Sequence, residues 1–176
     1  MYKINKLLQA PTKLFHTQDL ALLWGIDNRN TLYTQIKRYV QKGILHPIHK
    51  GFYATVSPSQ INPILLGMGY LHDYAYLSGE SVLFSHGIIF QQSPYITLVS
   101  SVSKKFTIAG NQYLVRKLKP EFLFNPLGLV YKNNYFEATL ERAVADLLYF
   151  LPQKHFDNPL INWLKVKTIQ KGVYQK

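Results

Sequence analysis

The 176-residue sequence has no cysteine, few acidic residues and no long hydrophobic run. Without cysteine, neither a disulfide framework nor a thiolate zinc site can form, and nothing indicates secretion. The longest uninterrupted apolar run, residues 64–71, has eight residues and includes two glycines, so it is too short to cross a bilayer. The N-terminal stretch also lacks the apolar core and cleavage site of a signal peptide. We therefore expect a cytoplasmic protein without a membrane partner.

Several catalytic motifs are absent as well. The chain has no His-Glu-x-x-His pair, no phosphate-binding loop of Walker type, no Gly-x-Ser-x-Gly elbow, and no Glu-x-Lys or Asp-x-Lys tripeptide of a nuclease strand. These absences predict that the protein is not an enzyme and uses no cofactor. A metal-dependent nuclease stays open as an alternative, in which four carboxylates would converge on divalent cations: Asp73, Glu137, Glu141 and Asp146.

Positive charge is the clearest feature that the sequence does have. Twenty lysines and arginines against nine acidic residues give a net charge of +11, and 47% hydrophobic residues are enough for a packed core. Residues 1–56 carry eight basic and two acidic residues, a net charge of +6, whereas the remaining 120 residues carry twelve basic and seven acidic residues, a net charge of +5. The N-terminal third is the more basic part and favours a polyanionic partner.

Two helices are predicted in this basic segment. Thr17 can act as the N-cap of the first, and Gly25 can end it. The second helix follows a short turn, and its apolar residues recur at intervals of three and four, which places them on one face. The apolar residues are Leu32, Ile36, Tyr39 and Val40.

The opposite face of the second helix is polar and basic. It carries Asn30, Thr34, Lys37, Arg38 and Gln41. After this helix, residues 45–50 and 52–56 read as two strands joined at Lys50-Gly51. Helix, turn, helix and a two-stranded wing is the order of a winged helix-turn-helix, in which one helix enters the DNA major groove. A solvated helix face or a protein-interaction module is the alternative interpretation.

The rest of the chain predicts a second domain of mixed character. Residues 57–63 are rich in proline and serine and favour a linker. Residues 64–176 then predict a mixed α/β domain with a small antiparallel sheet and a long amphipathic helix over residues 137–151. Strands are expected at 95–102, 105–109, 113–118 and 129–131. The fold class is therefore α+β, with a winged helix-turn-helix at residues 1–56.

Some polar residues of this second domain have a structural interpretation. We expect Ser78 to cap a helix, Glu80 to interact with the dipole of that helix, and His86 to be a buried or packing histidine. Glu137 and Glu141 fall at the start of the long helix. Arg142 and Asp146 are spaced for an exposed ion pair worth a few tenths of a kcal/mol.

A second basic cluster falls on adjacent predicted strands. It comprises Lys104, Lys105, Arg116, Lys117 and Lys119. Because side chains alternate between the faces of a strand, we expect the cluster to be split between two faces and largely solvated. The alternative is a further surface for nucleic acid or for an acidic partner. The lysines after residue 157 are interpreted as solubilising.

Five stretches, in order, carry a family resemblance: KGFYA after the predicted helices, YLSGESVLFSHGI, PYITLVS, EATLERAVADLLYFLP and HFDN. Over residues 14–158 the chain resembles the AbiEi-type antitoxins of type IV toxin-antitoxin systems, which are linked to abortive phage infection. The resemblance implies a repressor that binds inverted repeats of double-stranded DNA in its own promoter. It also implies an antitoxin that counteracts a nucleotidyltransferase-like toxin without a stable complex.

The resemblance also assigns the DNA contacts of this sequence. They are Asn30, Thr31, Thr34, Lys37, Arg38 and Gln41 in the second helix of the N-terminal pair and Lys50 in the wing. The N-terminal part of the helix is expected to read bases and the cations to position the phosphates. Neutralisation of the toxin by direct protein contact is the alternative, in which the chain would have no affinity for its promoter.

Overall fold

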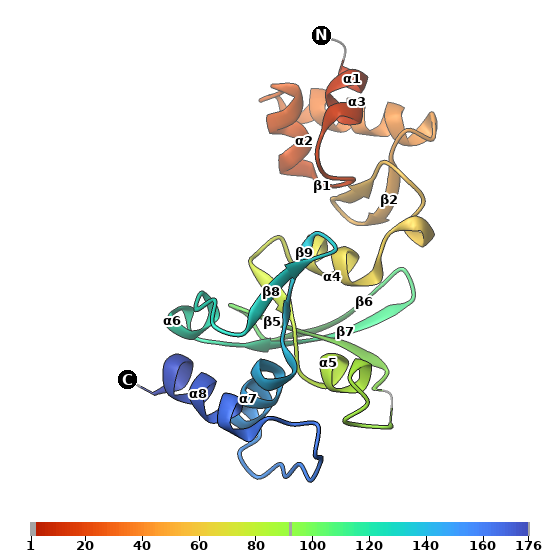
Figure 1. The fold of residues 1–176 in the computed structure, drawn as a ribbon. Helices are drawn as coiled ribbons and strands as arrows, with labels where there is room; N and C mark the ends of the chain where they lie inside the picture. The colour runs from red at the N-terminus through yellow and green to blue at the C-terminus, as the bar shows by residue number, and fades with distance from the viewer. Residues whose placement is uncertain (1–2, 92, 176) are drawn as a thin grey trace. The chain divides into compact units, whose positions relative to one another are not determined.

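The computed structural model describes residues 3–91 and 93–175 and has an α+β fold (Figure 1). The chain forms two compact units, which divide between His72 and Asp73. No helix in the described ranges is long and apolar enough to cross a membrane. Each unit has its own sheet.

The first unit contains helices and a three-stranded sheet. Its elements are α1 (Lys3–Gln9), β1 (Leu14–His16), α2 (Thr17–Trp24), α3 (Arg29–Gln41), β2 (His46–His49), β3 (Phe52–Ala54), the 3-10 turn η1 (Pro58–Gln60) and α4 (Pro63–Leu71). The strands pair antiparallel in the order β1-β3-β2. The hairpin predicted at Lys50-Gly51 is confirmed, whereas β1 was not predicted because it has only three residues.

The core of the first unit forms between α1, α2 and α3, which lie together in Figure 1. Leu20 and Trp24 of α2 are buried against Leu32 and Ile36 of α3. Leu32 and Ile36 are among the apolar positions whose helical spacing predicted the second of these helices. Their burial leaves the opposite face of α3 exposed to solvent.

Helix α4 belongs to the first unit, although the sequence predicted a linker at 57–63 and a second domain from residue 64. The ring Nε2 of His16 lies 2.8 Å from the carbonyl oxygen of Gly69. A Cβ atom at Gly69 would lie 2.7 Å from Leu14 Cδ1, so α4 packs closely on β1. The second compact unit therefore begins at Asp73, nine residues later than the second domain predicted from residue 64.

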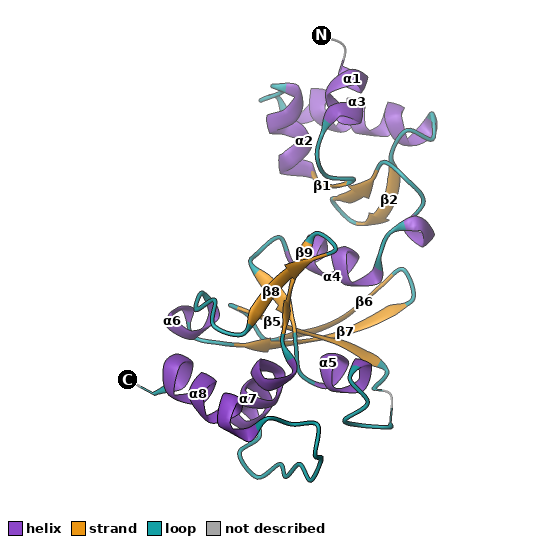
Figure 2. Cartoon of the chain, in the orientation of Figure 1, coloured by secondary structure: helices purple, strands orange, loops and turns teal. Residues whose placement is uncertain are grey.

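The second unit combines a six-stranded sheet with helices. Its elements are β4 (Ala75–Leu77), α5 (Glu80–Ser85), β5 (Tyr95–Ser100), β6 (Lys104–Ile108), β7 (Asn111–Lys117), α6 (Pro120–Leu123), β8 (Leu129–Lys132), β9 (Tyr135–Ala138), α7 (Leu140–Phe150) and α8 (Trp163–Tyr174). Figure 2 shows α5, α7 and α8 on the same side of this sheet.

The prediction of a small antiparallel sheet is wrong. The strand order is β6-β7-β5-β4-β9-β8, and two of the pairings, β5 with β7 and β4 with β9, are parallel. Strands β6 and β7 form an antiparallel hairpin, with β6 at the edge of the sheet. The second strand of this hairpin, β7, runs in the same direction as β5 and pairs with it. The turn of that hairpin lies at Ala109-Gly110, between the strands expected at 105–109 and 113–118, and both residues have positive φ.

The long amphipathic helix is confirmed, but it begins later than predicted. Helix α7 starts at Leu140, and the side chain of Thr139 caps it by accepting a hydrogen bond from the Arg142 amide. Glu137 therefore belongs to β9, where it is buried and pairs with Lys132 at 3.0 Å. Glu141 lies in the first turn of α7, as predicted. Helix α8, which was interpreted only as a lysine-rich tail, packs against α7.

Candidate functional site

The turn between α2 and α3 is set by two capping residues. Gly25 ends α2 in the left-handed conformation, with φ of 61°. Asn28 then begins α3, and its side-chain oxygen accepts a hydrogen bond from the Thr31 amide at 3.0 Å. The N-cap of α2 is His16 rather than Thr17, since the His16 amide donates to the Asp19 carboxylate at 2.7 Å. These caps hold α3 at a defined start.

All of the residues assigned to DNA contacts are exposed. They are Asn30, Thr31, Thr34, Lys37, Arg38, Gln41 and Lys50. In the part of the chain that the structure describes, no carboxylate forms an ion pair with Lys37 or Arg38. The face of α3 thus presents cations and amides to solvent while Leu32 and Ile36 hold the opposite face in the core.

Two threonine hydroxyl groups on α3 form hydrogen bonds to nearby residues of the same helix or its N-cap. Thr34 donates a hydrogen bond to the Asn30 carbonyl at 2.8 Å, and Thr31 donates to the side-chain oxygen of Asn28 at 3.2 Å. Their methyl groups are therefore the parts that could meet a thymine methyl. Thr31 contributes to the cap of α3 as well as to its surface.

The β2–β3 hairpin is attached to the start of α2. The Thr17 amide donates to the Gly51 carbonyl at 2.9 Å, and Gly51 has φ of 76°, which favours glycine at this turn. The rings of His49 and Tyr70 pack edge to face, with centroids 5.3 Å apart. These contacts place Lys50 at an exposed and well-supported hairpin tip.

The sequence interpretation missed two exposed residues of α3, Arg29 and Tyr33. The guanidinium carbon of Arg29 lies 5.6 Å from the centroid of the Tyr33 ring. An arginine and an aromatic residue at i and i+4 on a helix are neighbours on its surface, so the spacing alone was a usable signal. It was overlooked because Tyr33 falls between the apolar and polar faces of the helical pattern.

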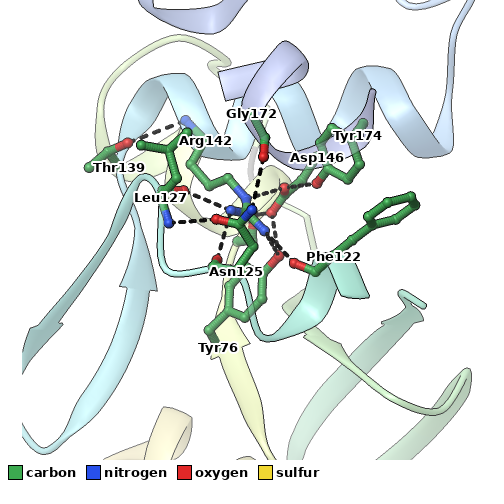
Figure 3. A network of polar contacts seen from close by, with 10 residues as sticks. Tyr76, Phe122, Asn125, Leu127, Thr139, Arg142, Asp146, Gly172 and Tyr174 are labelled. Atoms are coloured by element: carbon green, nitrogen blue, oxygen red, sulfur yellow. Dashed lines mark hydrogen bonds and ion pairs between the residues drawn. The ribbon is translucent and has the colours of Figure 1, made fainter. Parts of the chain in front are cut away.

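A second polar centre lies inside the second unit, around Arg142 and Asp146 of α7 (Figure 3). Both side chains are fully buried, and Arg142 Nε lies 2.7 Å from Asp146 Oδ1. The prediction of an exposed pair is therefore wrong. The i, i+4 spacing predicted the pairing, but burial depends on packing by segments distant in sequence, such as α8 and β4.

The guanidinium of Arg142 makes five hydrogen bonds. Beyond Asp146, it donates to the Tyr76 hydroxyl at 3.1 Å and to backbone carbonyl oxygens of the loop around α6. These carbonyls belong to Phe122, Asn125 and Leu127, at 3.2, 3.2 and 2.7 Å. Arg142 thereby fastens this loop to α7 and has no donor left for a ligand.

Asp146 is equally saturated. It accepts hydrogen bonds from Arg142, from the Tyr76 hydroxyl at 3.0 Å, from the Ser78 hydroxyl at 2.7 Å and from the Tyr174 hydroxyl. Ser78 is therefore a partner of Asp146 and not a helix cap, which corrects the sequence interpretation. Helix α5 instead begins after Gly79, whose φ is 62°.

The pKa values in this network follow from burial and the charge of Asp146. Burial raises the pKa of Tyr76 and of Tyr174 well above the ordinary value, and the neighbouring Asp146 carboxylate raises both further. Burial alone lowers the pKa of Arg142, but the attraction of Asp146 outweighs it and the net shift is upward. Arg142 therefore keeps its charge and the two tyrosines stay neutral, as in a structural network.

The other polar residues singled out in the second unit have surface or structural positions. Glu80 forms an ion pair with Arg116 at 2.8 Å, rather than acting only on the helix dipole. His86 is exposed, not buried, because α5 ends there and its ring Nδ1 lies 2.9 Å from the Val82 carbonyl oxygen on the helix surface.

The second basic cluster is split between the two faces of the sheet, as predicted. Lys104 pairs in register with Val115, which is two residues from Lys117, so these two lysines share a face. Lys105 pairs with Leu114 and therefore shares the opposite face with Arg116. The strand alternation thus prevents a single continuous basic patch over β6 and β7.

Three of the four carboxylates proposed for a nuclease alternative have other partners. Asp146 is saturated by its network, Glu137 pairs with Lys132, and the Asp73 carboxylate accepts hydrogen bonds from the Tyr74 amide and the Ser101 hydroxyl. Within residues 3–91 and 93–175, no group of three or more histidines and carboxylates is arranged to hold a metal ion.

Comparison with known proteins gives no further assignment. No model of a protein family matches this chain, and no curated protein matches it.

Proposed function

We propose that the first unit is a winged helix-turn-helix that binds double-stranded DNA in a sequence-dependent manner. In this proposal, α3 enters the major groove and the β2–β3 hairpin acts as the wing. The observation that carries it is the polar and basic face of α3, on which Asn30, Lys37, Arg38 and Gln41 are all exposed to solvent.

Charge supports the same function. Residues 1–72 carry eight basic and two acidic residues, a net charge of +6, and one of the two acids, Asp19, lies 3.2 Å from His72. Lysines and arginines without an acidic partner can neutralise DNA phosphates and release their counterions. The amides of Asn30 and Gln41 have the donor and acceptor pattern that matches adenine in the major groove.

The wider proposal is that the chain is a cytoplasmic antitoxin that represses its own type IV toxin-antitoxin operon. It would bind inverted repeats in the promoter and counteract a nucleotidyltransferase-like toxin without a stable complex. The sequence resemblance to AbiEi-type antitoxins supports this part of the proposal. The saturated Arg142–Asp146 network supports a scaffold role for the centre of the second unit, since its polar groups already have partners.

The test uses the full chain and two labelled duplexes, the promoter of its own operon and a scrambled duplex of equal length and composition. We expect tighter binding to the promoter duplex at two salt concentrations. Equal affinity for both duplexes, or no binding, would overturn the DNA-binding proposal. A tight complex with the toxin, together with no promoter affinity, would select neutralisation by direct contact instead.

The antitoxin part needs a separate measurement. Co-expression with the neighbouring nucleotidyltransferase-like gene should restore growth that this gene alone arrests. If co-expression leaves the growth arrest as strong as with the toxin gene alone, the antitoxin role is wrong, and the DNA-binding result is unaffected.

A further inference from the structure

Arg29 and Tyr33 form a cation–π contact in the first turns of α3. Arg29 is the first residue of the helix, and Tyr33 follows four residues later. The distance of 5.6 Å from the guanidinium carbon to the ring centroid is within the range of a cation–π contact. Both residues are exposed, and Tyr33 keeps 44% of its surface accessible. The ring therefore restricts the orientation of the guanidinium without covering it.

The cation–π contact does not use the hydrogen-bond donors of Arg29. A guanidinium has its donors in its plane, whereas the contact with an aromatic ring uses the face of that plane. Among the residues that the structure describes, no carboxylate forms an ion pair with Arg29. The side chain is thus an oriented cation with unpaired planar donors, placed beside Asn30 at the start of α3.

We propose that Arg29, oriented by Tyr33, donates two hydrogen bonds to O6 and N7 of a guanine in the DNA site. This inference rests on the proposed DNA binding by α3. A bidentate arginine matches the two major-groove acceptors of guanine, and residues at the start of a recognition helix contact base edges. Lys37 and Arg38, about two turns further along α3, lie where contacts to phosphates are expected.

Tyr33 acts in this proposal as a positioning residue. Without the ring, the arginine keeps its charge but must lose more side-chain freedom on binding, which lowers affinity for the specific site. Phenylalanine at this position keeps an aromatic ring for the cation–π contact, whereas alanine removes it. Tyr33→Ala should therefore weaken binding to guanine-containing sites and leave binding to scrambled DNA unchanged, while Tyr33→Phe should resemble the wild type.

The experiment begins with the full-length wild-type protein and a pool of random-sequence duplexes, from which the preferred site is selected. Each guanine of that site is then replaced by 7-deazaguanine, which lacks the N7 acceptor. We expect one position at which the replacement weakens wild-type binding by about tenfold, the order expected for loss of a bidentate base contact. In the Arg29→Ala variant, 7-deazaguanine at that position should change affinity by less than about twofold, because the arginine that would contact N7 is already absent.

The controls separate folding, charge and base recognition. Lys13 is an exposed cation outside α3 and the hairpin, so Lys13→Ala should keep the full effect of 7-deazaguanine. Circular dichroism and thermal unfolding should show that Arg29→Ala and Tyr33→Ala fold like the wild type, since both side chains are exposed.

The outcomes distinguish this inference from the proposed function. If the wild type selects a site and Arg29→Ala keeps the same sensitivity to 7-deazaguanine, DNA binding stands and the role of Arg29 is wrong. If no guanine of the selected site is sensitive, the role of Arg29 is again wrong. If the wild type selects no sequence from the pool, the proposed function itself fails.

Discussion

Arg142 and Asp146 lie one turn apart on α7, and their side chains form a fully buried ion pair with a separation of 2.7 Å between Nε and Oδ1. Buried ion pairs must recover the cost of removing two charges from water, and this one does so through additional hydrogen bonds to both partners. The pair joins α7 to β4 through Tyr76 and to α8 through Tyr174. The second unit therefore depends on a polar centre rather than on apolar packing alone.

Replacing Asp146 by asparagine should strongly destabilise the second unit. The change leaves the buried Arg142 charge without a counter-ion, which costs about 3–5 kcal/mol of unfolding free energy. Hydrogen exchange followed by mass spectrometry should show that amides of α7 and α8 lose protection while those of α3 keep it. The matched control is Glu141→Gln, which removes an equal charge at a half-exposed position one turn away. An equal loss in both variants would contradict the structural role of the buried pair.

The stability of the second unit should fall as the pH rises above about 10. Burial raises the pKa of Tyr76 and Tyr174 above the ordinary value of 10.0, and burial also raises the pKa of Tyr113 to about 12. In the unfolded chain these phenols ionise near pH 10, whereas in the folded chain they stay neutral to higher pH. Their contribution is therefore fully present below about pH 10 and is lost as the pH rises towards the folded-state values.

Urea unfolding at a series of pH values from about 8 to about 11 measures this dependence. Tyr174→Phe removes one of the titrating groups and should give a shallower decline above pH 10, although its stability at pH 8 is lower because the hydrogen bond to Asp146 is lost. If the free energy of unfolding falls with pH equally steeply in the wild type and in Tyr174→Phe, the Tyr174 phenol does not contribute to the pH dependence.

Gly128→Ala should destabilise the protein more than Gly110→Ala does. Both glycines have positive φ, 77° and 80°, so alanine at either site costs about 1–2 kcal/mol in backbone strain. At Gly128 a Cβ would also lie 2.8 Å from Arg142 Cβ, whereas at Gly110 it would meet nothing within 4 Å. The difference between the two variants in thermal or urea unfolding measures the steric part, expected at about 1–3 kcal/mol. Equal losses would show that the loop before β8 can move away from α7.

Local patterns were sufficient to predict the elements that carry the candidate interface. The spacing of Leu32 and Ile36 predicted both the existence of α3 and its buried face, and Gly25 correctly predicted the end of α2. The exposed positions of Lys37 and Gln41 follow from the same periodicity. An amphipathic helix with a glycine stop contains the relevant information within a few turns of sequence.

The centre of the second unit could not be predicted in the same way. Strand β4 has three residues, all buried, so it shows no alternation from which a strand could be recognised. The burial of Arg142 depends on Tyr76, which is 66 residues away in the sequence, and on Tyr174 of α8. Ser78 was misread for the same reason, because its partner Asp146 lies 68 residues further along the chain. Such contacts are set by tertiary packing and leave no local signal.

The last prediction concerns two kinds of change on α3. Lys37→Ala and Arg38→Ala should weaken binding to specific and scrambled duplexes alike, and each should lower the slope of log affinity against log salt by about one unit, as expected for one lost phosphate contact. Asn30→Ala and Gln41→Ala should instead alter which duplex sequence is preferred and leave the salt slope unchanged. Fluorescence anisotropy at several salt concentrations measures both quantities, with Lys13→Ala as an exposed cation outside the interface. Each of the four variants differs from the wild type only at one exposed residue of α3. Unchanged affinity and sequence preference in all four would therefore mean that this face of α3 is solvated and does not contact DNA.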